Sequence, residues 1–547
     1  MKSTYIYYIS AFTLLFFLPF LGAFQLFDWD EVNFAECARE MLLSGDYSQV
    51  TINFTPFWEK PPLFIWMQAA SMKLFGINEF AARLPNVLAA LFTFIFLFRA
   101  GKELHGIKMG VLWIICFAGS ILPNLYFHSG IIDPWFNLFI VLAIYYAYKG
   151  LTSRLNMHYV YAGLFIGLAV LTKGPVGILL FMGILGLFML FNYGNYKVSI
   201  SGIALFGITF TLVGGFWFFI LLIQGKEHII ADFINYQIRL FQTEDAGHGG
   251  PFYYHFIVLL LGCFPASIYA LRNISLKKKN NLTFMMILTL LFTLLLFSIV
   301  QTKIIHYSSL CYFPISFLAA DYLCRRSNDS KMLKKSSTTM CIGIVVFFVL
   351  ITGLTWVLDH PQLILNNFET DSFTKDALSQ DFDKPWHLYI PSLFLFGTVI
   401  LMLVAYKKGR SLSIVIGGYF SIAMTLTLMS GFIGPRITQI TQSSHVEFCQ
   451  NVSKKDVYVR SIGFKSFVPL FYGNQKQQEH LHYLSEEWLV NGPVDKPAFF
   501  SSKSDQKEAI LESYPNLHVL YDKGGFTFYS RKDQSEISGS LFPEKNN

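Results

Sequence analysis

Long apolar runs separated by short polar loops fill the chain between residues 5 and 432. A membrane-spanning helix needs about 20 mainly apolar residues, and on that basis the sequence predicts about thirteen spans. They lie near residues 5–27, 83–99, 109–127, 131–148, 158–172, 175–191, 201–223, 254–271, 283–300, 307–323, 338–358, 387–406 and 411–432. The pattern is typical of an all-α polytopic membrane protein, and the first run is expected to stay as an anchor.

Every second loop of this pattern is rich in lysine and arginine. The basic residues are Arg99, Lys102, Lys108, Lys149, Arg154, Lys197, Arg272, Lys277, Lys278, Lys279, Arg325, Arg326, Lys331, Lys334, Lys335, Lys407, Lys408 and Arg410. Short cytoplasmic loops carry such an excess, so these loops are expected in the cytoplasm. The loop 359–384 on the other side is acid-rich, and an odd number of spans leaves the carboxyl end outside. We therefore expect any chemistry on the non-cytoplasmic face.

Three outside regions are long enough to hold structure of their own: residues 28–82, residues 224–253 and the tail from 433. In the first, residues 31–43 and 62–75 show helical spacing of apolar residues and are too short to span, which favours helices lying in the membrane interface. The tail predicts strands at 456–460 and 497–501, a helix at 506–513 and a hairpin over 518–529. The sequence thus predicts a transmembrane domain at 1–432 and a small α/β domain at 433–547 outside the membrane.

Composition narrows the class further. With 53% hydrophobic and 14% charged residues and a mean hydropathy of +0.45, the chain is too apolar for a soluble globule. The net charge of +7 sits in the loops that orient helices, so nucleic acid is not an expected partner. The seven cysteines are scattered without metal-binding spacing, which favours small buried residues.

Acidic and basic residues gather in the first outside region. Asp28, Asp30 and Glu31 follow the first span; a cap for the next helix explains Asp28, whereas Asp30 and Glu31 could deprotonate a hydroxyl or hold a divalent cation. Glu59 and Lys60 stand before two prolines. A helix start accounts for the prolines alone, but a lysine on rigid backbone also suits a phosphate.

One further acid lies at the start of a predicted span. An aspartate at the centre of a membrane helix costs about 2.5 to 3.5 kcal/mol, so Asp133 needs a partner. Lys173, in an outside turn, is the natural candidate. We favour a structural ion pair over a direct catalytic role for these two residues.

Two later outside loops add cations. Arg239 and His248 lie in the loop 235–254 among aromatic residues, where a flexible surface loop is the alternative to ligand contact. Lys303, His306 and Tyr307 join two spans on the same face and supply donors for an anion. Several loops on one face thus predict an anion-binding cavity.

These motifs, taken in order, resemble those of the lipid A aminoarabinose transferase (ArnT) and protein O-mannosyltransferase-like group. The matching segments are Asp30-Glu31, Phe34 to Met41, Ser44 to Asp46, Glu59 to Leu63, Ala81 to Pro85, Lys173 to Pro175, Glu244 to Tyr254 and Lys303 to Tyr307. The resemblance covers roughly residues 1 to 330. Where the aminoarabinose enzymes usually read Asp-Glu-x-Arg-Tyr-Ala-Glu, this chain has Asn33 and Phe34, which leaves the donor sugar and the acceptor open.

The resemblance implies a GT-C fold and a sugar donor carried on polyprenyl (undecaprenyl) phosphate in a bacterial inner membrane, with the site on the periplasmic side. It implies Asp30 as the catalytic carboxylate, and Glu59 and Lys60 as a cation ligand and a donor-phosphate contact. Glu31, with the later cations, would bind donor phosphate and substrate. A divalent metal on Asp30 and Glu59 is a further expectation. The acceptor would be lipid A, another glycolipid or glycan, or a protein.

The resulting hypothesis is an inverting transfer in which Asp30 takes the acceptor proton and Lys60 stabilises the departing phosphate. A transporter or lipid flippase is the main alternative, since polytopic proteins with intramembrane charges often move substrates. It predicts charges near the midplane and broken helices in matching halves, whereas these charges gather at one face. A membrane scaffold with a binding tail is a third interpretation, and it leaves Asp30 and Glu59-Lys60 unexplained.

Overall fold

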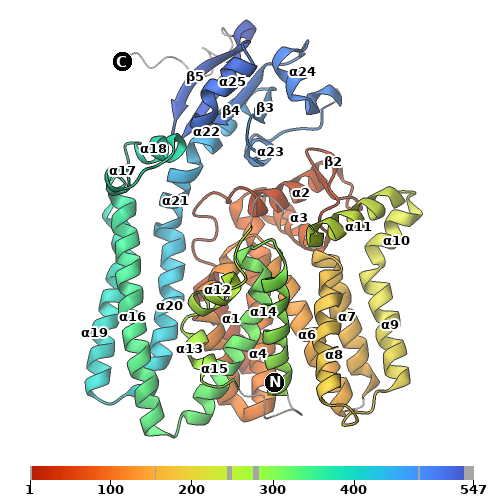
Figure 1. Ribbon diagram of the computed structural model, residues 1–547, viewed down its shortest axis with the longest axis vertical. Coiled ribbons are helices and arrows are strands. Elements are labelled where there is room, and N and C mark those ends of the chain that lie inside the picture. The colour runs from red at the N-terminus through yellow and green to blue at the C-terminus, as the bar shows by residue number, and fades with distance from the viewer. Residues whose placement is uncertain (1–2, 154, 243–248, 275–281, 479–480, 535–547) are drawn as a thin grey trace.

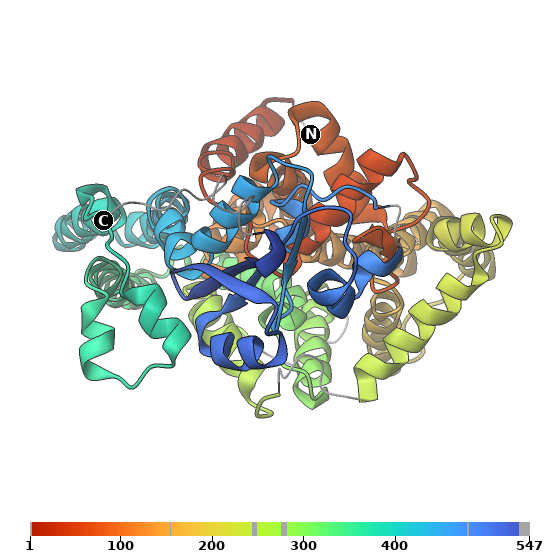
Figure 2. The same cartoon turned by 90° about the horizontal axis from the view of Figure 1, so that it is seen from above.

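The structure is a computed structural model that describes residues 3–534 except 154, 243–248, 275–281 and 479–480. A bundle of helices forms its lower part, and a smaller α/β unit sits on one end of the bundle (Figure 1). Seen from above, this unit lies over the middle of the bundle (Figure 2). The basic loops after α8, α15 and α19 lie at the opposite end (Figure 1), so the predicted separation of charge between the two ends is present.

The bundle accounts for every apolar run found in the sequence. Its helices are α1 (Ser3–Phe17), α4 (Glu79–Ala118), α5 (Ile121–Leu125), α6 (Asp133–Ser153), α7 (Asn156–Lys173), α8 (Val176–Phe191), α9 (Ile200–Gly214), α10 (Phe216–Ile223), α12 (Tyr254–Gly262), α13 (Ala266–Leu271), α14 (Leu282–Ile299), α15 (Tyr312–Arg326), α16 (Ser330–Asp359), α19 (Ile390–Lys407) and α20 (Ser411–Phe432). Short 3-10 turns precede α6, α15 and α19, namely η1 (Tyr126–His128), η2 (Ile305–Cys311) and η3 (Trp386–Tyr389).

The number of spans stays a prediction. Among the described residues, 5 helices are long and apolar enough to cross a membrane, or 7 if each bent pair is one span. α4 contains the predicted run 83–99 and the first part of the run 109–127, and it breaks at His105 and Gly106, where Gly106 has φ +77°. A Cβ added at Gly101 would lie 2.8 Å from the Cα of Gly110, so the two halves of α4 pack against each other across this break. Many runs are shorter than a full span because such breaks interrupt them.

The two helices predicted for the first outside region are present as α2 (Asp30–Ser44) and α3 (Leu63–Phe75), joined through the hairpin β1 (Thr51–Ile52) and β2 (Thr55–Pro56). α2 differs from the expected interfacial helix, because Glu31 to Met41 are all buried. The reason is that the carboxyl-terminal unit covers its outer face; Arg39 donates 2.6 and 2.7 Å bonds to Glu36 and a 2.7 Å bond to the carbonyl of Gln475. In the second outside region, α11 (Glu227–Gln242) follows α10.

The tail forms a four-stranded sheet in the order β3-β4-β6-β5, made of β3 (Tyr458–Ser461), β4 (Ala498–Lys503), β5 (Leu517–Lys523) and β6 (Phe526–Arg531). β3 and β4 are parallel and the other pairs antiparallel. Helices accompany it: α21 (Gly434–Thr441), α22 (Ser443–Val452), α23 (Val468–Phe471), α24 (Glu486–Asn491), α25 (Lys507–Ser513), with η4 (Leu481–Leu484), η5 (Ser504–Gln506) and η6 (Lys532–Gln534). The outside loop after α16 contributes α17 (Gln362–Asn367) and α18 (Ser372–Leu378). All predicted tail strands and the predicted helix are present.

The sheet is covered on both faces, which explains why β4 is a continuous buried run. Phe499 packs in one cluster with Phe448 of α22, and Phe500 packs in another with Ile510 of α25. Strands buried on both faces carry apolar residues without alternation. The cluster of Phe499 also contains Val32 and Met41 of α2. One apolar core therefore joins the α/β unit to the helix that begins at Asp30.

Candidate active site

A cavity of about 520 Å³ lies where the top of the bundle meets α2, α11 and the carboxyl-terminal unit. Residues from seven separate stretches of the chain line it. Among them are the predicted site residues Asp30, Glu59, Lys60, Asp133, Lys173, Arg239, His306 and Tyr307. The expectation that charged groups from several outside loops gather in one place is thus met for these residues.

Asp30 is the first residue of α2, and its carboxylate is half exposed to the cavity. Its Oδ2 lies 3.6 Å from Nε2 of His306. The backbone before it is unusual, because Trp29 has φ +77° and ψ −112°. Asp28 supports this conformation: its Oδ1 accepts bonds from the amides of Trp29 (2.8 Å) and Phe467 (3.0 Å). Asp28 therefore fixes the start of the helix from outside it, rather than capping it as expected.

Glu59 and Lys60 lie opposite α11. Nζ of Lys60 is 4.0 Å from Oε2 of Glu59, and it also lies 5.5 Å from the ring centre of Tyr236. The Tyr236 hydroxyl donates a 3.0 Å bond to the same carboxylate oxygen. Burial lowers the pKa of Lys60 below its usual value, and the charge of Lys173 adds to this while Glu59 opposes it. A bound phosphate would raise the pKa of Lys60 again, because a nearby negative charge favours the charged amine.

Asp133 and Lys173 form the ion pair that the sequence predicts, with Nζ 2.7 Å from Oδ1. Both side chains are largely buried, at 4% and 14% exposure. The Lys173 ammonium also lies 5.5 Å from the ring centre of Tyr307 and 5.6 Å from that of Phe136. The pair lines the cavity as well as joining two helices, so Lys173 adds to the positive field that an anion in the cavity experiences.

His306 and Arg239 also line the cavity. Burial lowers the pKa of His306 below its usual value, and the charges of Lys173 and Lys60 act in the same direction, against Asp133 and Asp30. A neutral imidazole is the form that this shift favours at neutral pH. Arg239 stacks over the Tyr236 ring, with its guanidinium carbon 5.2 Å from the ring centre. Arg239 is exposed and lines the outer part of the site.

Two predicted ligand residues lie elsewhere. Glu31 points away from the cavity and is held by Arg83 through bonds of 2.8 and 2.9 Å, and by the amides of Phe27 and Gly130. Burial alone would raise the pKa of Glu31, but Arg83 and the two amides hold it below the usual range. The substrate role expected for Glu31 is thus corrected to a structural one, because its carboxylate is fully engaged.

Lys303 is the second correction. Its Nζ donates to the backbone carbonyls of Phe297 (3.2 Å), Ser298 (2.8 Å) and Val300, which close the end of α14, and the residue is only 6% exposed. A lysine that caps carbonyls in this way is not aimed at a ligand. His248 lies outside the described residues.

Several residues that line the cavity were not expected as site residues, among them Trp29, Tyr236, Lys465 and Phe467. The last two come from the carboxyl-terminal unit. Nζ of Lys465 lies 5.3 Å from the ring centres of both Trp29 and Phe467. The only signal in the sequence is a lysine between aromatic residues in the loop after β3, and nothing local connects that loop to the first outside region.

The side chains of the cavity are a poor fit for a divalent metal on Asp30 and Glu59. Divalent cations favour several oxygen ligands together, and the described residues contain no group of three or more His, Cys, Asp and Glu side chains that could hold one. Instead, each carboxylate has a nitrogen neighbour, Lys60 at 4.0 Å and His306 at 3.6 Å.

Comparison with known proteins agrees with this geometry. A family profile described as dolichyl-phosphate-mannose-protein mannosyltransferase matches residues 59–217, the segment that begins at Glu59. The chain is 26% identical over 62% of its length to an undecaprenyl phosphate-alpha-4-amino-4-deoxy-L-arabinose arabinosyl transferase of Wigglesworthia glossinidia brevipalpis, covering 63% of that protein. A protein of the same name from Shewanella sediminis is 27% identical over 78% of this chain and 76% of its own.

The fold matches as well. The crystal structure of ArnT from Cupriavidus metallidurans bound to undecaprenyl phosphate superposes with a TM-score of 0.74 at 16% identity, covering 97% of this chain and 98% of that one. In sequence and fold the chain is therefore similar to glycosyltransferases of the ArnT and protein O-mannosyltransferase type. The resemblance noted in the motifs is confirmed. For an ArnT-type GT-C protein the α/β unit is part of the matched fold, because the superposition covers nearly the whole chain.

Proposed function

We propose that this transferase moves a sugar from a polyprenyl phosphate donor to an acceptor hydroxyl at the non-cytoplasmic face of a bacterial inner membrane. The observation that carries the proposal is the single cavity in which the half-exposed Asp30 faces the cations of Lys60, Lys173 and Arg239. A lipid phosphate needs cations, and an attacking hydroxyl needs a base; the cavity offers both. The relatives named for undecaprenyl phosphate donors support the same donor class.

The donor phosphate would bind on the side of the cavity formed by Lys60 and Arg239. As the bond between the anomeric carbon and the phosphate oxygen breaks, its electron pair stays on the phosphate. Fixed cations in a site of low dielectric stabilise that developing charge, a term that is often the largest in enzyme catalysis. Tyr236 holds these cations in place, because its ring contacts both Lys60 and Arg239 and its hydroxyl binds Glu59.

Asp30 would act as the general base. The acceptor oxygen forms the new bond to the anomeric carbon while its proton passes to a carboxylate oxygen of Asp30, and attack opposite the leaving phosphate inverts the configuration. Its half exposure leaves room for an acceptor. His306, 3.6 Å away and favoured in the neutral form, orients the carboxylate without consuming its charge.

Location of the site follows from the same logic. The basic loops lie at the end of the bundle opposite the cavity (Figure 1), and an excess of Lys and Arg marks cytoplasmic loops. The cavity and the α/β unit would then face the periplasm. An alkaline phosphatase fusion after η6 should be active in cells, whereas a fusion in the loop after α15 should be inactive; the opposite result would reverse the orientation.

The test of the function uses purified full-length protein in nanodiscs with a set of undecaprenyl phosphate sugars and extracts of envelope lipids, glycans and proteins. Release of undecaprenyl phosphate together with a glycosylated product is the expected result. Lipid A is one acceptor to include. If no donor of this class is bound or consumed, the proposal fails.

A further inference from the structure

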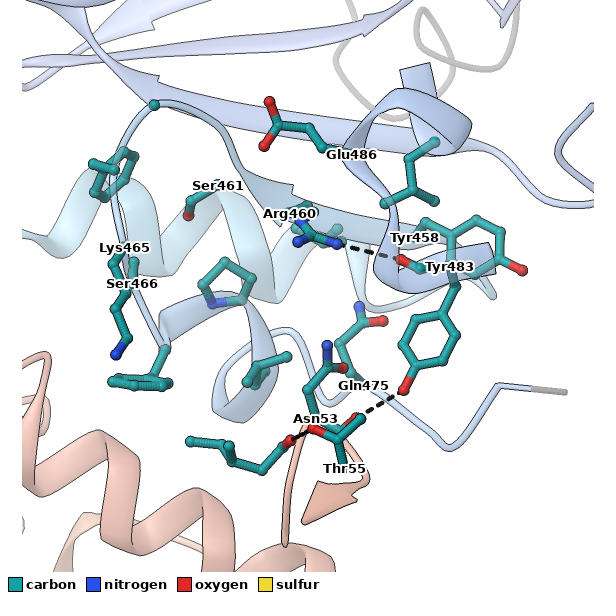
Figure 3. Close-up of a pocket in the computed structure, with 18 residues that line it drawn as sticks. Asn53, Thr55, Tyr458, Arg460, Ser461, Lys465, Ser466, Gln475, Tyr483 and Glu486 are labelled. Atoms are coloured by element: carbon teal, nitrogen blue, oxygen red, sulfur yellow. Dashed lines mark hydrogen bonds between the residues drawn. The ribbon is translucent and has the colours of Figure 1, made fainter. Parts of the chain in front are cut away.

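A second cavity, of about 560 Å³, lies beside the first. It lies between the β1–β2 hairpin below and β3, α23 and the start of α24 above (Figure 3). Lys465 and Phe467 line both cavities. The two spaces are therefore neighbours, divided by the loop that follows β3, and a molecule in the second cavity has the first within reach.

The side chains of this second cavity are those that recognise carbohydrate. Tyr483 and Phe464 supply aromatic rings, while Asn53 and Gln475 supply amide groups (Figure 3). Sugar rings present apolar C–H faces together with hydroxyl groups, so they bind where aromatic faces and two-way hydrogen-bonding groups occur together. The volume lies within the range of about 300 to 1,000 Å³ that is typical of small-molecule sites.

The charged side chains of the second cavity favour an anionic ligand. Arg460 and Lys465 line the cavity together with one carboxylate, Glu486, so the cations outnumber the acid by two to one. Arg460 is fixed in place because its Nη1 donates to the carbonyls of Leu484 (2.6 Å) and Tyr483 (3.3 Å). No other hydrogen bond of this guanidinium is found within the described part of the chain. Since arginine carries five N–H donors, the rest of its fork can bind an anion.

A polypeptide would need a different surface. β3 is the edge strand of the sheet, and an extended peptide binds such an edge by adding a strand. Here the edge is covered. Arg460 is tied to the segment 483–484, and the Tyr483 hydroxyl donates a 2.7 Å bond to the carbonyl of Asn53, which fastens that segment to the hairpin (Figure 3).

We propose that the second cavity binds the carbohydrate part of the acceptor, and that Arg460 and Lys465 hold an anionic group on it. This inference rests on the proposed function, because an acceptor bound here would extend past Lys465 to place a hydroxyl beside Asp30. The carboxyl-terminal unit then selects the acceptor, while the bundle binds the donor. The anionic sugar could belong to a glycolipid or to a lipid-free glycan, which share this head-group chemistry.

The test measures binding to the full-length protein in nanodiscs by calorimetry. The probes are a set of disaccharide phosphates, each with its uncharged parent disaccharide, and a serine-rich peptide; undecaprenyl phosphate is titrated in parallel. Arg460→Gln and Lys465→Gln each remove one cation of the cavity. Lys465 makes no hydrogen bond among the described residues, so its variant tests binding without disturbing the fold. Lys532→Gln is the matched control, because it removes an exposed cation of the same unit outside both cavities.

Loss of a hydrogen bond to a charged group should raise the Kd of the disaccharide phosphate about ten- to hundredfold in Arg460→Gln and Lys465→Gln, with Lys532→Gln unchanged. Undecaprenyl phosphate affinity should stay unchanged in Arg460→Gln. Tighter binding of an acylated probe would assign the sugar to a glycolipid, and equal binding to a lipid-free glycan.

Three results would overturn the inference: binding of the peptide alone, failure of every disaccharide phosphate to bind, or disaccharide binding unaffected by both variants. If the wild-type protein binds no undecaprenyl phosphate, the proposed function itself fails, and this outcome is separate from the other three.

Discussion

Asp30 and Glu31 are neighbours in the chain, but Asp30 lines the cavity as the proposed base whereas Glu31 is bonded to Arg83, and Asp30→Asn tests this difference. The Asp30 side chain is 50% exposed, and Nε2 of His306 lies 3.6 Å from its carboxylate. An exposed contact of this kind contributes about 0 to 1 kcal/mol. We therefore expect Asp30→Asn to fold with a free energy of unfolding within about 1 kcal/mol of the wild type.

The effect on turnover should be far larger. A positioned general base contributes about 100- to 10,000-fold to a rate, which is roughly 2.7 to 5.4 kcal/mol at 1.36 kcal/mol for each tenfold step. The amide of asparagine cannot accept the acceptor's proton, although it keeps the size of the carboxylate. Single-turnover transfer from an undecaprenyl phosphate sugar measures this loss, and the affinity for the donor should be nearly unchanged.

Glu31→Gln is the matched control, because it makes the same chemical change one residue further on. Its carboxylate is 5% exposed and pairs with Arg83, which is 0% exposed. Removing one partner of a buried pair leaves an uncompensated charge and costs about 3 to 5 kcal/mol. Glu31→Gln should thus lower the thermal stability strongly while the protein that remains folded still transfers sugar.

The roles given to Asp30 and Glu31 are wrong if the two variants behave alike. Near-normal turnover in Asp30→Asn would remove the general base, and a Glu31→Gln protein as stable as the wild type would show that the pair with Arg83 is not needed. A stable Glu31→Gln protein with no turnover would return Glu31 to the reaction.

Three other predictions follow from the same structure. Because the pKa of Lys60 is lowered, its amine should lose its proton at a lower pH than a free lysine, and activity should fall as pH rises through that range. In Lys60→Arg the alkaline limb of the kcat/KM profile should move to higher pH, since arginine keeps its proton. An unmoved alkaline limb would show that deprotonation of Lys60 does not cause the loss of activity. Lys173→Met should lower the free energy of unfolding, measured by thermal unfolding, by about 3 to 5 kcal/mol, because Asp133 is left buried without its partner. Adding Asp133→Asn should recover much of that loss. A Lys173→Met protein as stable as the wild type would contradict this. Phe448→Ala should lower the free energy of unfolding by about 3 to 5 kcal/mol, because it opens a void in a core where Phe448 is 0% exposed. A loss below about 1 kcal/mol would show that neighbouring side chains fill the void.

The sequence predicted the structural elements that depend on residues near one another in the chain. Apolar runs located the helices of the bundle, and alternation with a glycine pair located β5 and β6, because residues near in the chain determine both patterns. The contact between Asp133 and Lys173 was also predictable, since a buried aspartate requires a cation and Lys173 lies in a turn predicted on the same face.

Local sequence patterns did not predict contacts between segments far apart in the chain. Glu31 and Lys303 carry the residue types of a ligand site, but Arg83 and the carbonyls at the end of α14 already bind them. Charge type alone does not reveal whether a group is engaged within the protein. α2 was expected in the membrane interface, and only the packing of a unit more than 400 residues away explains why it is buried.

That packing also explains how Asp30 is positioned. Just before it, Gln442 donates to the carbonyl of Leu26 (2.7 Å) and accepts from the amide of Asp28 (3.2 Å), while the carboxylate of Asp28 accepts from the amide of Phe467 (3.0 Å). Two residues of the carboxyl-terminal unit thus hold the backbone that turns at Trp29 into α2. A base must be held within a fraction of an ångström of the proton it removes. The unit therefore contributes to the candidate active site rather than being an attached module, since Gln442 and Phe467 hold the backbone before Asp30, the proposed base, and Lys465 lines the cavity.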